Sequence, residues 1–228
     1  MKDTPKEFFE NQEKIYCKNF KEKWTQITSE GVVRHDGVAD RDGYAIVLRH
    51  PDEVVKSVSS IATEIGAAVP SMIYQGSSVH TTLALFKMQR RSAEAQSIDY
   101  NLVDRISNRI KNSIIPPGEL EYRGVLMNRD TVIAEGYANE DFVNCKNKIL
   151  ESINSLSDNF NLRGPWGGHI TLARFLESKP ADEVRDLFEV IRETKPYVGH
   201  HLPVAIDIAY ISVQNEAIEM TTMEQYAL

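Results

Sequence analysis

The feature that most constrains this chain is a seven-residue pattern that occurs twice. Residues 80–86 read His-Thr-Thr-Leu-Ala-Leu-Phe and residues 169–175 read His-Ile-Thr-Leu-Ala-Arg-Phe, so five of the seven positions are identical. The two histidines are 89 residues apart, which is too far for a short-period solenoid and suits two similar halves of one protein. We therefore expect a bilobal chain with one copy of the pattern in each half.

Each copy of the pattern lies between stretches of helical periodicity, which gives the two halves a similar order of elements. Apolar residues recur at three- and four-residue intervals in four stretches, and β-branched or aromatic runs between them predict strands. The expected helices cover 54–65, 102–110, 142–156 and 184–191, and the expected strands cover 44–50, 120–127, 131–137 and 204–213, with an extended stretch to residue 228. No low-complexity linker divides them, so we expect one compact unit.

A separate amphipathic helix is predicted at the N-terminus. Residues 4–7 read Thr-Pro-Lys-Glu, which combines a helix N-cap, a proline at the first helical position and the acidic residue of a capping box. Aromatic and aliphatic residues then follow mostly at helical spacing over 8–27, as in a helix that packs on the body of a protein. We divide the chain into residues 1–43, an N-terminal helix and loop, and residues 44–228, a single bilobal domain.

Strand geometry brings polar side chains of the repeated pattern together. Side chains two residues apart share a face of a strand, so His80 lies beside Thr82, and His169 lies beside Thr171. A small alanine follows on each of these faces and leaves room for a ligand. The same alternation places Leu85 in the core, on the face opposite His80.

Two imidazoles that face each other across a cleft can divide the roles of general acid and general base near neutral pH. Two threonine hydroxyls can donate hydrogen bonds to the non-bridging oxygens of a phosphate held between them. This constellation suits phosphodiester chemistry without a metal, so we expect neither a metal nor another cofactor.

The paired His-x-Thr motifs, each followed by apolar strand residues, resemble those of the two-histidine (2H) phosphoesterase superfamily. The resemblance covers roughly residues 44–228 and implies a bilobal α+β fold with pseudo-two-fold related halves, in which two antiparallel sheets line a central cleft and helices cover the outside. It implies that His80 and His169 are catalytic and that Thr82 and Thr171 bind phosphate. For the opening of a 2′,3′-cyclic phosphate by water it implies His169 as base and His80 as acid.

Three further residues near the motifs are candidates for substrate binding. Tyr74 precedes the first motif and Trp166 precedes the second; either ring could stack on a nucleobase or cover the edge of the cleft. Arg174 lies within the second motif, but strict alternation turns it away from His169 unless the strand bulges or ends there.

Charge and composition restrict the partners of the protein. A net charge of −7 argues against sequence-independent binding to long duplex nucleic acid, whereas a small nucleotide or an RNA end remains a suitable substrate. The two cysteines are far apart and form no metal-ligand spacing, and no stretch is long and apolar enough to cross a membrane. These features favour a cytoplasmic protein that needs no membrane, and we expect a monomer.

The leading prediction is therefore a phosphodiesterase that opens 2′,3′-cyclic phosphates or cleaves 2′-5′ bonds. The same chemistry also allows RNA 2′-5′ ligation, which is the reverse reaction, and hydrolysis of cyclic or signalling oligonucleotides. A nucleotide-binding module without catalysis is an alternative of another class. A metal-dependent hydrolase built from His35, His50 or the pair His200-His201 is a third, although that pair has no carboxylate or cysteine at ligand spacing.

Overall fold

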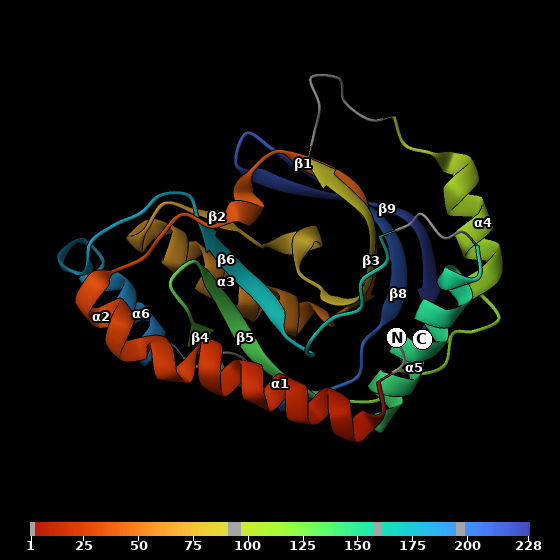
Figure 1. The fold of residues 1–228 in the computed structure, drawn as a ribbon, viewed down its shortest axis with the longest axis horizontal. Coiled ribbons are helices and arrows are strands. Elements are labelled where there is room, and N and C mark those ends of the chain that lie inside the picture. The colour runs from red at the N-terminus through yellow and green to blue at the C-terminus, as the bar shows by residue number, and fades with distance from the viewer. Residues whose placement is uncertain (1–2, 91–96, 157–160, 195–198) are drawn as a thin grey trace.

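Figure 1 shows the computed structural model, which describes residues 3–90, 97–156, 161–194 and 199–228. Its helices are α1 (Pro5–Asn19), α2 (Trp24–Glu30), α3 (Asp52–Ala68), α4 (Tyr100–Ile110), α5 (Glu140–Asn154) and α6 (Arg185–Glu193). Its strands are β1 (Arg41–Arg49), β2 (Ser71–Ile73), β3 (Thr81–Arg90), β4 (Leu120–Met127), β5 (Thr131–Ala138), β6 (Ile170–Phe175), β7 (Gly199–His201), β8 (Ala205–Gln214) and β9 (Ala217–Ala227). Within the described ranges, no helix is both long and apolar enough to span a membrane.

The strands form one antiparallel sheet in the order β7-β4-β5-β6-β3-β1-β8-β9, and β2 pairs with β6 in addition. Counted outward from the centre, the halves contribute β3-β1-β8-β9 and β6-β5-β4-β7. They meet at a single register pair, Thr81 with Ile170. The predicted α+β class with antiparallel strands and outer helices is confirmed; the strands of the two halves are continuous at this pair, in one curved sheet (Figure 1).

Helices α3 and α5 tie the halves together because each packs on strands of the other half. Helix α3 links β1 to β2 and β3, yet its apolar face lies in one buried cluster with residues of β6 such as Leu172 and Phe175. Helix α5 links β5 to β6, yet it shares a buried cluster with residues of β1 and β3 such as Ile46 and Leu83. Each of these helices covers strands of the opposite half. The central seam, where the halves pair at Thr81 and Ile170, is therefore stabilised by a helix from each half.

The N-terminal segment is two helices and not the single helix that the periodicity predicts. Helix α1 has the expected capping box at Thr4 and Glu7 and ends at Asn19, and a short 3₁₀ turn precedes α2. The break falls at Phe20, which leaves helical geometry and buries its ring, 5% exposed, against Tyr16 and Trp166. Burial of this aromatic ring outweighs the continuation of the helix.

Two equivalent β-bulges turn side chains of the repeated pattern toward the inside of the curved sheet. On β3, Thr82 and Ala84 pair with consecutive residues of β1, so the intervening Leu83 is the extra residue. On β6, Thr171 and Ala173 pair with consecutive residues of β5, so the intervening Leu172 is the extra residue. Each bulge reverses the alternation that follows it.

Because of the bulges, the residues that follow them point to the opposite face from the one that simple alternation predicts. Alternation places Leu85 in the core, but this residue lines the cavity that contains His80, whereas Ala84 lies in a buried core cluster. Arg174, the residue equivalent to Leu85 in the second copy, lines the same cavity. Strict alternation turns this arginine away from His169; the bulge brings it back.

Candidate active site

A cavity of about 260 Å³ lies between the two copies of the pattern. Its wall contains side chains from β1, β3, β6 and β8 and from the loop that precedes β6. All seven residues that the sequence singled out line it: Tyr74, His80, Thr82, Trp166, His169, Thr171 and Arg174. The structure therefore brings together, from two distant parts of the chain, the groups expected to act on one phosphate.

His80 is oriented by a backbone carbonyl two residues earlier. Its Nδ1 lies 2.7 Å from the oxygen of Ser78. Because a carbonyl can only accept, Nδ1 donates, and in the neutral ring Nε2 carries the free lone pair. Burial lowers the pKa of His80 to about 4, with smaller contributions from Arg49 and Arg174, while the Ser78 carbonyl opposes the shift by favouring the protonated ring.

His169 is held by an aromatic ring. The indole of Trp166 stacks on its imidazole with ring centroids 4.1 Å apart and an angle of 19° between the planes. Burial, and to a smaller extent the charges of His80 and Arg174, lower the pKa of His169 to about 3. The Gly167 backbone favours the protonated ring, although Nδ1 lacks a partner with full hydrogen-bond geometry among the described residues.

These shifts make both site histidines neutral in the free protein near pH 7. His80 lowers the pKa of His169, and Arg174 lowers the pKa of both rings, so the two histidines belong to one electrostatic site. An anionic phosphate between them opposes the charge of Arg174 and restores the tendency of an imidazole to take up a proton. The site can therefore hold one acid and one base when an anion is bound.

Thr81, the middle residue of the first His-x-Thr motif, stabilises the central seam next to the site. Thr81 is fully buried and its hydroxyl lies 2.8 Å from the Tyr122 hydroxyl and 3.2 Å from Nε2 of His50. It also donates to the backbone oxygen of His169 over 3.3 Å. Nδ1 of His50 in turn lies 3.0 Å from Nε2 of His201. Sequence reasoning missed this network, since its members come from five different strands or strand ends.

Tyr74 and Arg174 support one wall of the cavity. The guanidinium carbon of Arg174 lies 5.5 Å from the centre of the Tyr74 ring, and the Tyr74 ring lies 6.1 Å from that of His80. Tyr74 is only 3% exposed, packs with Val38 and supports the cationic and imidazole groups beside it.

Helix α1 contributes contacts that the sequence did not predict. The Gln12 side chain accepts a hydrogen bond from the backbone N–H of Gly168, 2.8 Å away and adjacent to His169. The hydroxyl of Tyr16 donates to the carbonyl of Gly136 and accepts from its N–H, at 2.8 and 3.1 Å, and its ring meets Trp166 edge-on. Helix α1 thus fixes the loop that presents the second histidine. The helical periodicity indicated a packed helix but could not identify what it packs against.

Several further residues line the cavity and were not singled out. They are Arg41, Leu85, Met88, Asn161, Arg163, Gly164, Pro165, Ile211, Val213 and Ile218. The two arginines add positive charge to that of Arg174. Arg163 belongs to the stretch before the second motif, whereas Arg41 lies at the far end of a neighbouring strand and carries no signal in the sequence.

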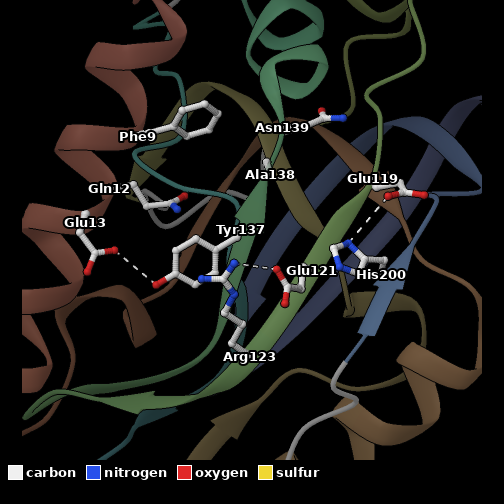
Figure 2. Close-up of a pocket in the computed structure, with 10 residues that line it drawn as sticks. All are labelled: Phe9, Gln12, Glu13, Glu119, Glu121, Arg123, Tyr137, Ala138, Asn139 and His200. Carbon is white, nitrogen blue, oxygen red and sulfur yellow. Dashed lines mark hydrogen bonds and ion pairs between the residues drawn. The ribbon is translucent and has the colours of Figure 1, made fainter.

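A second pocket, of about 410 Å³, lies between α1 and the edge of the sheet at β4 and β7 (Figure 2). Its charged groups pair with one another: Arg123 contacts Glu121 at 2.8 Å and lies over the Tyr137 ring, and His200 lies 3.7 Å from Glu119. Among the described residues, no group of three histidine, cysteine or carboxylate side chains is placed to hold a metal ion.

Solved structures share this fold. TT0787 of Thermus thermophilus superposes with a TM-score of 0.53 at 16% sequence identity, over 82% of this chain and 97% of its own. LigT of E. coli, solved with 3′-AMP, gives 0.52 at 14% identity, over 82% of this chain and 98% of its own. A protein described as a phosphoesterase gives 0.53 at 16% identity, with coverage of 82% and 98%.

At these identities the likeness establishes the fold, which is that of LigT-like proteins and is consistent with the 2H phosphoesterase superfamily that the paired motifs resemble. No protein-family model matches the chain, and no curated protein matches it significantly.

Proposed function

We propose that this protein is a phosphodiesterase that acts on small nucleotides or RNA ends through His80 and His169 and needs no metal for catalysis. The observation that carries the proposal is the convergence of both motifs on one cavity, with a threonine from each motif in its wall. LigT, which has the same fold, was solved with 3′-AMP, and this supports a nucleotide as the ligand class.

The most concrete reaction is the opening of a 2′,3′-cyclic phosphate by water. His169 removes a proton from the attacking water through Nε2, and the water oxygen forms a bond to phosphorus. The bond from phosphorus to the 3′ oxygen breaks, and His80 gives its proton to that oxygen, which leaves a 2′-phosphate. Thr82 and Thr171 donate hydrogen bonds to the non-bridging oxygens as charge builds on them.

The division of roles follows the resemblance to the 2H superfamily, and the environments of both rings allow it. The Ser78 carbonyl favours the protonated form of His80, and the Gly167 backbone favours that of His169. Either ring can therefore take up or release a proton once an anion is bound. Arg174 is placed to neutralise the phosphate charge from the cavity wall. Formation of a cyclic phosphate, as when the neighbouring 3′ hydroxyl attacks a 2′-5′ phosphodiester and the 5′ oxygen leaves, uses the same groups with their roles exchanged.

Turnover assays with EDTA present test the proposal. A panel of 2′,3′-cyclic nucleotides, 2′-5′ oligoadenylates and RNAs with cyclic-phosphate ends is incubated with the wild type, His80→Ala and His169→Ala. We expect turnover by the wild type and a loss of roughly 10²- to 10⁴-fold in each variant, the range typical of a missing general acid or base. His200→Ala, at an exposed histidine in the pocket of Figure 2, is the matched control and is expected to retain full activity.

Three results would count against the proposal. Unchanged turnover in His80→Ala or His169→Ala removes the mechanism. Tight nucleotide binding without turnover by the wild type favours the binding module, and activity that chelators abolish and a divalent ion restores favours the metal-dependent hydrolase.

A further inference from the structure

The wall of the site carries more positive charge than one phosphate needs. Arg41, Arg163 and Arg174 all line the cavity, and none of the described residues that line it is a carboxylate. This local excess occurs in a chain with a net charge of −7. A cationic wall of this kind in an acidic protein is a site for anions.

Arg41 is oriented by uncharged backbone groups, and Arg174 keeps one donor without a partner among the described residues. The Arg41 guanidinium donates to two backbone carbonyls, those of Asp36 at 2.6 Å and Ala39 at 3.3 Å, which fix its direction without cancelling its charge. Its pKa is lowered by burial and by the charges of Arg174 and Arg90. Nε of Arg174 is buried and has no hydrogen-bond partner among the described residues.

Arg163 reaches the cavity from the opposite segment of the chain. Its backbone exchanges two hydrogen bonds of 2.8 Å with Leu85 on β3, which anchors the residue beside the first motif. The second pocket provides a contrast, because its Arg123 is paired with Glu121 and stacked on Tyr137 (Figure 2). Arginines that are held by their backbone or by carbonyls, in a wall without carboxylates, are prepared for an incoming phosphate.

We infer that Arg41 and Arg163 bind a second phosphate of the substrate, in addition to the phosphate held between His80 and His169. The preferred substrate is then a nucleotide that carries a 5′-phosphate or a neighbouring phosphodiester, and not a nucleoside cyclic phosphate alone. This inference rests on the proposed function and specifies its substrate class.

Calorimetric binding of matched ligands tests the inference without requiring turnover. The ligands are 2′-AMP, adenosine 2′,5′-bisphosphate, and a dinucleotide that ends in a 2′-phosphate and has one internal phosphodiester. We expect the bisphosphate, the dinucleotide or both to bind the wild type at least about tenfold more tightly than 2′-AMP, the effect of one charge-assisted contact. Whichever of the two gains affinity identifies the source of the second phosphate.

Variants assign the gain to particular residues. Arg41→Gln and Arg163→Gln are each expected to lose most of the added affinity while their affinity for 2′-AMP stays within about twofold of the wild type. Arg90→Gln is the matched control, since Arg90 is exposed, pairs with Arg41 in the sheet and does not line the cavity. Should Arg41→Gln fail to fold, the exposed Arg163 still provides the test.

Each outcome separates the subsite from the proposed function. Equal affinity of the wild type for all three ligands overturns the subsite and leaves the phosphodiesterase in place, as does an equal loss for all ligands in both glutamine variants. Failure of the wild type to bind any of the three ligands overturns the proposed function together with the subsite.

Discussion

Because the site histidines are buried as neutral rings, the free energy of unfolding should fall as the pH is lowered. The pKa of His169 is about 3 in the folded protein against an ordinary value of 6.5, so the folded state keeps the ring neutral while the unfolded chain takes up a proton. The stability due to the neutral ring is complete above about pH 6.5 and is lost as the pH falls toward the folded-state value. Between about pH 7.5 and pH 5.5 the free energy of unfolding falls by about 1.4 kcal/mol for this one residue.

Denaturant unfolding of the wild type and His169→Gln at the two pH values measures this contribution. The wild type loses stability through every histidine whose pKa is lowered, a set that comprises His35, His50, His80, His169 and His201. The glutamine variant is expected to lose about 1.4 kcal/mol less than the wild type over the same interval. His200→Gln, at an exposed position, is the control and should follow the wild type. If the wild type and His169→Gln lose equal stability, His169 is not buried as a neutral ring and the reasoning fails.

Two further predictions concern the loop of the second motif and the anion site. Gln12→Leu leaves the Gly168 N–H without its acceptor and is expected to lower the free energy of unfolding by about 1–3 kcal/mol and to reduce turnover, whereas Glu10→Leu, an exposed change on the same helix, should do neither. Unfolding and turnover measured on both variants check this, and normal turnover of a destabilised Gln12→Leu would limit α1 to a structural role. Sulfate is expected to bind more tightly as the pH falls from about 7.5 to 5.5, because an anion between His80 and His169 favours their protonation. Calorimetry at constant ionic strength checks the trend, and an affinity independent of pH would contradict it.

The repeated pattern allowed much of the site to be predicted from the sequence. Strand periodicity is local, so the motifs alone placed His80 beside Thr82 and His169 beside Thr171, and their repetition suggested that the two copies face each other. The strands predicted over 120–127 and 131–137 are confirmed by β4 and β5, which pair directly with each other. These features depend on short stretches of chain, which is why they can be inferred without coordinates.

Features that depend on register or on distant packing could not be inferred. Nothing in the sequence marks Leu83 and Leu172 as bulged, yet these bulges turn Leu85 and Arg174 into the cavity. The register of β1 against β3 decides that Arg41 reaches the site. The segment that α1 packs against is likewise decided by tertiary contacts. Helical periodicity shows which face of the helix is buried, but not which loop that face contacts.

The central claim is that both imidazoles meet one phosphate, and an experimental structure with bound 2′-AMP tests it most directly. The account predicts phosphate oxygens within about 2.6–3.2 Å of Nε2 of both His80 and His169, with Thr82 and Thr171 donating to the same group. A phosphate bound elsewhere, or in contact with only one of the two rings, would contradict it.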